Sequence, residues 1–446
     1  MTYARRTVRV MGAPLTLTLI LALVLALASC SSSGSSSSTT TAAPGSTAGT
    51  TPGSTPGSAP GSTPGSAPGS GPGTTSGTAP KLSTGASVTA ADKQAVVDTY
   101  AAGVYASYVA AVASAEKLQA DLKAFTAAPS QAGLDAAKEQ WLAARDDYGP
   151  TEAFRFYDGP IDAPETGPEG QINAWPMDEA YVDYVDGNET AGVINDPVAF
   201  PTITTDVLVQ ANEKGGETNI STGWHAIEFL LWGQDNNADA PGNRPFTDYT
   251  TKANAERRIT YVNLLADLLV EDLTTVRDAW APGADNYRAT FVKDPDKALA
   301  DVFRGIGALD KGELAGERMG VALETKDQED EHSCFSDNTA NDVKNNALGI
   351  QNVWLAAYPG GITGPGPRDL VAKVSPAAAT KTTDQLATSV ELTSTFPMTF
   401  EKMIQGEDTD PGRTALKAAI TAIQQQGDSI AEAAKALGLN VNFETD

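Results

Sequence analysis

The chain has 446 residues and carries 31 basic and 56 acidic side chains, but only two histidines and two cysteines. A formal charge of −25 repels phosphate backbones, so the sequence predicts no nucleic-acid partner. The acidity has two interpretations, attraction of cations and the solubility of an exported protein. With one cysteine near the N-terminus and one at position 334, the fold must be stabilised by its core rather than by disulfide bonds.

The N-terminal segment has the order of a bacterial lipoprotein signal. Three arginines within the first nine residues precede an apolar run over 15–27, which is shorter than the roughly 20 residues that span a membrane. Leu27-Ala28-Ser29-Cys30 then matches a lipobox. We therefore expect residues 1–29 to be removed and Cys30 to be lipidated, with an uncleaved N-terminal anchor as the alternative.

Residues 30–86 consist almost entirely of Ser, Thr, Ala, Pro and Gly. Such a segment has no apolar surface to bury, so it is predicted to be a disordered tether. The expected organisation is a signal over 1–29, a tether over 30–86 and a folded domain over 87–446. The protein would then be extracytoplasmic in the cell envelope, with the membrane as its partner through the lipid on Cys30.

The folded domain is predicted to be all-α, because apolar residues recur at steps of three and four and no strand-like alternation of any length is found. Thr89 and Ser130 are expected to precede helices that end near Phe125 and Tyr148. Further predicted helices cover 255–280, 297–323, 341–356 and 412–437. Three long Pro/Gly-rich connections are candidates to carry function: 158–176, 235–246 and 359–367.

His225 and Glu228 are the first candidate metal ligands. Ser221 or Thr222 can cap a short helix that Gly233 ends, which places the two side chains on one face at i and i+3. Carboxylate-bridged metal sites in helical bundles use the same spacing. A buried histidine paired with a neighbouring glutamate is the alternative, and spacing alone favours it.

The second histidine, His332, lies in an acidic stretch over 327–338. This stretch is either a second group of ligands or an exposed loop in which Ser333 or Asp337 caps the next helix. Cys334 could bind a soft metal, but beside an aromatic residue it is more typical of a small packed apolar side chain.

Two further stretches place charges among aromatic residues. Glu152 and Arg155 are spaced at i and i+3, which predicts a partly buried ion pair. A helix is expected to start at Pro176 with Asp178 and Glu179 in its first turn, where the helix dipole by itself favours acids.

Five blocks stand in order along the chain: Thr151–Phe156, Asn173–Tyr181, Gly223–Asp235, Gly242–Tyr249 and Glu331–Thr339. Taken together they resemble the imelysin-like family, also called the insulin-cleaving membrane protease family. The match extends over about 89–440, and one residue departs from the family pattern, because a histidine commonly stands where this chain has Ala340. The resemblance implies two helical bundles with a cleft between them, where the Gly-x-His-x-x-Glu helix lies and Gly223 is structural.

The resemblance also implies a role in bacterial iron uptake. A metal ion, iron or alternatively zinc, would be bound by His225 and Glu228, and an iron-uptake system would be a partner. The side chains expected in the same cleft are Glu152, Arg155, Asp178, His332 and Asp337.

Two other functions remain open. A metallopeptidase would need three protein ligands and a general base, and ligation by the two histidines and Glu228 leaves no clear base, which favours a binding protein over an enzyme. Alternatively, the protein binds haem or an iron-loaded carrier. A separation of His225 and His332 beyond about 10 Å would exclude a shared site.

Overall fold

The computed structural model describes residues 87–237 and 239–443, which fall within one compact unit of the chain. The predicted signal over 1–29, the lipidation site Cys30 and the predicted tether over 30–86 lie outside the described residues. Among the regular elements of the described part all are helices except one short strand pair, so the all-α prediction is confirmed.

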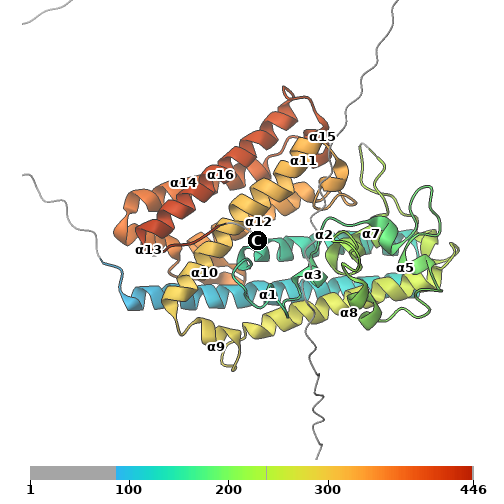
Figure 1. The fold of residues 1–446 in the computed structure, drawn as a ribbon, viewed down its shortest axis with the longest axis horizontal. Helices are drawn as coiled ribbons and strands as arrows, with labels where there is room; N and C mark the ends of the chain where they lie inside the picture. The colour runs from blue at the N-terminus through green and yellow to red at the C-terminus, as the bar shows by residue number, and fades with distance from the viewer. Residues whose placement is uncertain (1–86, 238, 444–446) are drawn as a thin grey trace, which may run out of the picture. The chain divides into compact units, whose positions relative to one another are not determined.

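A first bundle contains the motif helix. In it α2 and α8 lie along the long helix α1, and α7 packs on α2 and α8 (Figure 1). The helix bounds are α1 (Ala90–Ala127), α2 (Gln131–Tyr148), α7 (Gly223–Trp232) and α8 (Ala255–Ala279).

Both predicted starts in this bundle are confirmed. The hydroxyl of Thr89 accepts the N–H of Asp92, whose carboxylate accepts the N–H of Thr89 at 2.9 Å, so the pair forms a capping box. Ser130 caps α2 by accepting the N–H of Gly133 at 3.2 Å. By length and composition α1 could cross a membrane, but it is the central helix of the bundle, and packing accounts for its apolar face.

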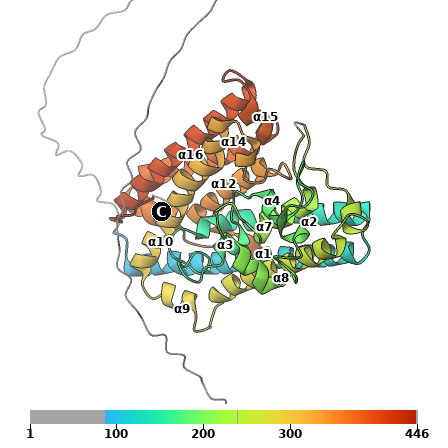
Figure 2. The same ribbon diagram turned by 45° about the vertical axis from the view of Figure 1, so that its right-hand side comes forward.

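A second bundle is formed by the chain from residue 295 onward, with α14 and α16 side by side and farthest from α1 and α8 (Figures 1 and 2). The two bundles predicted from the resemblance are thus present. The main helices of the second bundle are α10 (Pro295–Ala308), the π-helix η3 (Leu309–Val321), α12 (Thr339–Leu355), α14 (Pro376–Ser394) and α16 (Pro411–Ala436).

Short elements connect these helices. Strands β1 (Ala357–Tyr358) and β2 (Ile362–Thr363) pair antiparallel, with Ala357 opposite Thr363. The remaining helices are η1 (Gly149–Phe154), α3 (Glu169–Ile172), α4 (Glu179–Val182), α5 (Gly192–Asn195), α6 (Thr205–Ala211), η2 (Phe246–Tyr249), α9 (Tyr287–Phe291), α11 (Ala322–Thr325), η4 (Gln328–Asp330), η5 (Pro359–Gly361), α13 (Pro367–Val374) and α15 (Phe400–Gln405).

The predicted helix over 297–323 is not a single α-helix. α10 passes directly into the π-helix η3 and then into α11. Residues five apart align in a π-helix, and Arg318 accordingly donates to the Glu313 carboxylate at 3.0 Å. A periodicity of three and four cannot reveal this change, which alters the direction of the side chains in η3.

One predicted boundary is confirmed and another is wrong. The helix α2 ends at Tyr148 as predicted, and the 3₁₀-helix η1 begins at Gly149. The predicted start at Pro176 is wrong, because α4 begins only at Glu179. There the carboxylate of Asp178 accepts the N–H of Ala180 and acts as the N-cap.

The bundles meet closely at α12. A Cβ on Gly349 would lie only 2.4 Å from the carbonyl oxygen of Pro150, so glycine is what lets α12 lie against η1. Arg145, near the end of α2, forms a fully buried ion pair with Asp342 on α12, at 3.1 Å from Nη2 to Oδ1. Charged groups therefore lie inside the interface between the bundles.

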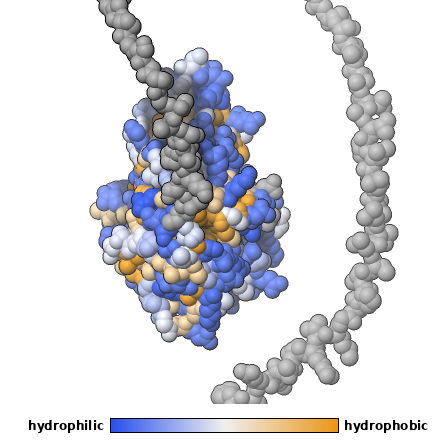
Figure 3. Space-filling view, turned by 90° about the vertical axis from the view of Figure 1, so that its left-hand side faces the viewer, coloured by the Kyte–Doolittle hydropathy of each residue, from blue (hydrophilic) through white to orange (hydrophobic). Residues whose placement is uncertain are grey.

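The surface of the described part is largely polar. The face seen in Figure 3 is mainly hydrophilic, with apolar residues in small groups. The large apolar side chains that are exposed are Val109, Val198, Val374 and Met398. The buried polar groups are therefore the more informative place to look for function.

Candidate metal centre

The motif helix α7 is buried along its whole length, from Gly223 to Trp232. Two of its residues, His225 and Glu228, are ionisable, with exposures of 1% and 0%. An isolated charge in such a place would cost several kcal/mol, so each group must be paired, bound to a ligand or neutral.

Glycine is required at the start of this helix. Gly223 has φ +84°, and a Cβ there would stand 2.4 Å from the carbonyl oxygen of Ile172. Thr222 occupies the N-cap position, but its hydroxyl makes no capping hydrogen bond. Gly233 ends the helix with φ +72°, as predicted.

His225 and Glu228 contact each other as their spacing predicts. Nδ1 of His225 lies 2.9 Å from Oε2 of Glu228. The other oxygen, Oε1, accepts the backbone N–H of Ser336 at 2.9 Å and its hydroxyl at 2.6 Å. Both oxygens of Glu228 thus have partners, whereas Nε2 of His225 is buried and has none.

His332 is held in the same way. It is 1% exposed, so the interpretation of its surroundings as an exposed loop is wrong. Its Nδ1 lies 2.9 Å from Oδ2 of Asp342, and the indole of Trp175 lies against its ring at 5.4 Å between centroids. Asp342 also accepts hydrogen bonds from Arg145, Ser333 and Asn338.

The two histidines lie together. Their ring centroids are 4.8 Å apart with the planes at 74°, well inside the separation that excludes a shared site. Each Nδ1 faces a side-chain carboxyl group, and an imidazole that donates to it from Nδ1 presents the lone pair of its Nε2. Both Nε2 atoms are buried and unpartnered. We name His225, Glu228, His332 and Asp342 the histidine centre.

Burial keeps both imidazoles neutral. It lowers the pKa of His225 to about 3, and the charge of Arg145 adds to the effect. It also lowers the pKa of His332 well below its usual value, with Arg318 as the next cause. Burial raises the pKa of Glu228 to about 8, against the hydrogen bonds from Ser336. Neutral imidazole is the form that binds metal ions.

A cavity of about 290 Å³ occupies the cleft between the bundles, and His332 forms part of its wall. The first half of the chain contributes Arg155 and Trp175, and the π-helix contributes Arg318. The charged lining comprises two arginines and four glutamates, Glu169, Glu213, Glu217 and Glu313, a formal balance of −2. The cleft predicted from the resemblance is therefore present, and its charge favours cations.

Glu152 anchors the arginines of the cleft. Its Oε2 accepts Nη1 of Arg155 at 2.8 Å and Nη2 of Arg318 at 2.6 Å. Although burial opposes it, these two guanidinium groups hold the pKa of Glu152 well below its usual value. The predicted ion pair of Glu152 and Arg155 is confirmed, and Arg318 joins it from the other bundle. Such a network fixes the cleft walls.

Other candidates from the sequence lie elsewhere. Asp178 is exposed, and its carboxylate caps α4 instead of joining the cleft. Asp337 lies with Asp235 and Glu401, and one carboxylate oxygen from each lies within 4.8 Å of the others. We name these three residues the acidic cluster. Cys334 is a buried free thiol whose pKa burial raises, as expected for a packed side chain.

The family model for imelysin matches residues 104–430 of this chain. The chain belongs to the imelysin family. The match includes both histidines, Glu152 and the acidic cluster. Ala340, where the family pattern commonly has histidine, is partly buried against the core in the first turn of α12.

Individual relatives support the family and the fold. Iron-regulated protein A of Synechococcus elongatus is 26% identical over 337 residues, covering 73% of this chain and 81% of that protein. A crystal structure from Parabacteroides distasonis, assigned as an iron-regulated protein A precursor, has a TM-score of 0.61 at 17% identity and covers 78% of this chain and 96% of that one. An imelysin-like protein from Psychrobacter arcticum has a TM-score of 0.58 at 14% identity, covering 80% and 99%. These two structures share the imelysin fold.

Sequence reasoning missed three residues of this imelysin-family centre: Arg145, Arg318 and Asp342. Each lies on the buried face of a predicted helix, where a charge stands out. Arg145, for example, is four residues after the buried Trp141. Charges on an otherwise apolar face were the signal that could have found them.

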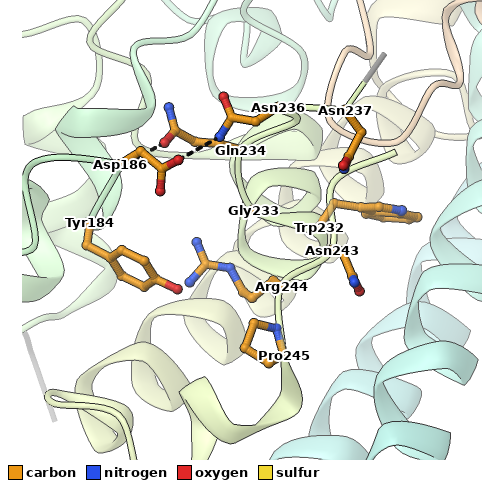
Figure 4. Close-up of a pocket in the computed structure, with 10 residues that line it drawn as sticks. All are labelled: Tyr184, Asp186, Trp232, Gly233, Gln234, Asn236, Asn237, Asn243, Arg244 and Pro245. Carbon is orange, nitrogen blue, oxygen red and sulfur yellow. Dashed lines mark hydrogen bonds between the residues drawn. The ribbon is translucent and has the colours of Figure 1, made fainter. Parts of the chain in front are cut away.

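A second cavity, of about 240 Å³, lies beside the loop that follows α7 (Figure 4). Gln234 accepts the N–H of Asp186 at 2.7 Å, and Asn236 donates to the Asp186 carboxylate at 3.1 Å. Arg244 donates to Asp183 at 2.7 Å. The polar side chains drawn there therefore hold the loop in place, and this loop belongs to the connection 235–246 that the sequence marked as a candidate.

Proposed function

We propose that this protein binds an iron ion in the cleft between its bundles, through Nε2 of His225 and Nε2 of His332. It would do so outside the cytoplasm, as a lipid-anchored protein that serves bacterial iron uptake. The observation that carries the proposal is the pair of contacting imidazoles whose Nε2 atoms are buried and unpartnered.

The hydrogen bonds of the pair favour a ligand over a purely structural role. A buried polar atom without a partner costs about 1–3 kcal/mol, and this pair holds two of them. Histidines that bind metal ions almost always place the other ring nitrogen against a carboxylate or carbonyl. Glu228 and Asp342 supply that contact here, at 2.9 Å each.

Iron fits the donors and the surroundings. Neutral imidazole suits iron as well as zinc, and two histidines with carboxylate donors are typical of ferrous sites. The lining of the cleft carries four glutamates, and its acidic balance favours cations. The name of the relative from Synechococcus elongatus states that it is iron-regulated, which favours iron over zinc.

Glu228 takes a different role from the one that its spacing suggested. Because Oε2 faces His225 and Oε1 accepts two hydrogen bonds from Ser336, we infer that Glu228 orients the imidazole instead of donating to the metal. Asp342 has the same role for His332.

The test uses the chain's two histidines. In untagged mature protein any imidazole signal comes from this centre, so Co²⁺ absorption and anaerobic Fe²⁺ titration report on it directly. We expect His225→Ala with His332→Ala to abolish both signals. Glu228→Gln should weaken Fe²⁺ binding by about 10–100-fold, as loss of a supporting carboxylate does.

The control is Asp178→Asn, which removes an exposed carboxylate outside the cleft and should leave binding unchanged. Fe²⁺ binding that survives the double histidine variant would contradict the proposal. Complete loss in Glu228→Gln, with the fold intact by circular dichroism, would make Glu228 a ligand after all.

Proteolysis separates this proposal from the peptidase alternative. We expect no cleavage of unfolded casein, with or without added Zn²⁺. Cleavage that disappears in the double histidine variant would favour the metallopeptidase.

The membrane attachment is tested separately. We expect mass spectrometry of the mature protein to find a lipidated Cys30 at its N-terminus, and Cys30→Ser to release the protein from the membrane fraction. Release of the wild type in soluble form would argue against the anchor.

A further inference from the structure

The acidic cluster is assembled from three separate parts of the chain. Asp235 follows the end of α7, Asp337 precedes α12, and Glu401 lies on α15. One oxygen of each lies within 4.8 Å of the others. The backbone N–H of Gly242 donates to the carbonyl of Phe335 at 2.9 Å, which ties the loop of Asp235 to the segment of Asp337.

Within the described part of the chain, lysine and arginine do not neutralise this group. The nearby amine of Lys402 pairs with Asp239 at 2.7 Å, and both of those side chains are largely exposed. Asp235 accepts hydrogen bonds from neutral donors, the N–H of Asn237 at 2.9 Å and the amide of Gln328. Three carboxylates thus stand together without an ion-paired cation.

Two buried carboxyl groups at the cluster each have an oxygen without a hydrogen-bond partner. Glu401 is 2% exposed, and its Oε2 has no hydrogen-bond partner, while Oε1 accepts only the amide of Gln405 at 3.1 Å. Glu331 is 1% exposed, its Oε1 also lacks a partner, and it is close enough to interact electrostatically with all three residues of the cluster. Burial, with the neighbouring charges of Asp235 and Glu401 as further causes, raises the pKa of Asp337 to about 6.

We propose that Asp235, Asp337 and Glu401 form a second cation site, separate from the histidine centre, and that it binds Ca²⁺, with Glu331 as a further oxygen donor. The donors are carboxylates without nitrogen or sulfur, which selects a hard cation. Three oxygens that all lie within 4.8 Å of one another fit inside a Ca²⁺ shell, whose ligands stand about 2.3–2.6 Å from the ion. Mg²⁺ usually keeps several waters instead of binding to an all-protein set of carboxylates, which favours Ca²⁺ here.

The proposed cation site would link segments that position the histidine centre. Glu401 belongs to the second bundle, whereas Asp235 follows directly on the motif helix. Asp337 is the neighbour of Ser336, which holds the carboxylate of Glu228. Calcium bound here would therefore fix the segment 331–338, which carries His332, against both bundles.

Thermal unfolding and calorimetry of the full mature chain with CaCl₂ test the site. We expect saturable binding and a rise in Tm for the wild type. Asp337→Asn and Glu401→Gln should each weaken Ca²⁺ binding by at least about tenfold, because each removes a charged ligand. Glu165→Gln, at an exposed carboxylate, is the control and should change nothing.

A second readout separates ligand loss from misfolding. Without calcium, Glu401→Gln should raise Tm, because it removes a buried charge, while it abolishes the rise with calcium. The variant lacking both histidines should bind Ca²⁺ like the wild type. This keeps the proposal distinguishable from iron binding at the histidine centre.

Three outcomes would overturn the site. The first is no calcium effect on the wild type at millimolar concentration. The second is a calcium effect that persists in Asp337→Asn with Glu401→Gln. The third is tighter binding of Mg²⁺ than of Ca²⁺, which would contradict the assigned cation.

Discussion

The histidine centre and the acidic cluster are neighbours along the segment 331–338, yet they are built in opposite ways. In the histidine centre both donor nitrogens are neutral, and a carboxylate holds each imidazole. In the acidic cluster the donors are ionisable carboxyl groups, and the hydrogen bonds that Asp235 accepts from Asn237 and Gln328 come from neutral groups. Arg145 and Arg318 lie beside the first, whereas ion pairs with the second are absent from the described residues.

The difference shows how one fold can present two kinds of cation site. Burial favours the neutral form of both kinds of group. A neutral imidazole can bind a borderline metal ion directly, whereas buried carboxyl groups that lie close together retain protons until a cation binds. The first site is organised before it binds, while the second depends more on its ligand. The predictions below test that contrast, from the largest expected effect to the smallest.

Loss of Arg145 should have the largest effect. Arg145→Met leaves Asp342 as a buried charge without its ion partner, which should lower the free energy of unfolding by about 3–5 kcal/mol in urea titrations. Arg368→Met removes the arginine of an exposed ion pair with Asp369 and should change the free energy of unfolding by less than about 1 kcal/mol. Equal effects of the two substitutions would show that the histidine centre is not organised by this pair.

Gly223→Ala should destabilise the motif helix by about 2–4 kcal/mol, because it adds both strain at positive φ and a clash with Ile172. Gly215→Ala is the matched control, since Gly215 has φ +90° but room for a Cβ, and it should lose about 1 kcal/mol. The difference between the two losses in free energy of unfolding, measured by chemical denaturation, gives the cost of the clash with Ile172 alone. Similar losses of stability in the two variants would mean that the backbone at Ile172 shifts to accommodate the added Cβ.

Asp310 provides a buried carboxylate that belongs to neither site. Burial raises its pKa well above the usual 3.8, and one of its oxygens has no partner. The penalty is absent only well below pH 3.8, where folded and unfolded forms are both protonated, and it grows as pH rises past that value. Asp310→Asn should therefore stabilise the protein by about 1–3 kcal/mol at pH 7, with the gain vanishing only as pH falls well below 3.8.

Urea titrations across that range measure the effect. Asp428→Asn, at an exposed neighbour, should shift stability by less than about 0.5 kcal/mol at either pH. A gain for Asp310→Asn that is independent of pH would point to packing instead of charge.

The smallest effect concerns Lys402, whose charge lowers the pKa of Asp337. Lys402→Met should tighten Ca²⁺ binding to the acidic cluster by about two- to threefold at low salt, and by less at high salt. Lys417→Met, which breaks the ion pair with Asp408, should leave calcium binding unchanged. Weaker binding in Lys402→Met would mean that Lys402 positions α15 instead of competing with the cation.

Helix periodicity predicted the long helices well but missed α14. The buried face of α14 is made of small and polar residues, Ala379, Thr382, Leu386, Ser389 and Thr393. Such a face has little hydrophobic contrast, so its helix is stabilised mainly by contact with α12 and α16. The π-helix η3 escaped for a related reason, because apolar spacing does not report a change from i+4 to i+5 bonding.

For the site, local spacing was enough for contacts within one helix. His225 and Glu228 meet because residues three apart share a helix face, and Glu152 pairs with Arg155 over the same spacing. Asp178 was placed in the cleft because its block matched the family, but its carboxylate serves its own helix instead.

By itself the sequence determined the helical class, the caps at Thr89 and Ser130, and the contact of His225 with Glu228, because each depends on residues a few positions apart. Only the tertiary structure decided that His332 faces His225, that Arg145 pairs with the Asp342 that contacts His332, and that Asp337 joins Glu401. The members of these pairs are separated along the chain, and the packing of the helices on one another brings them together. No local pattern encodes that packing, because it depends on all the buried surfaces at once.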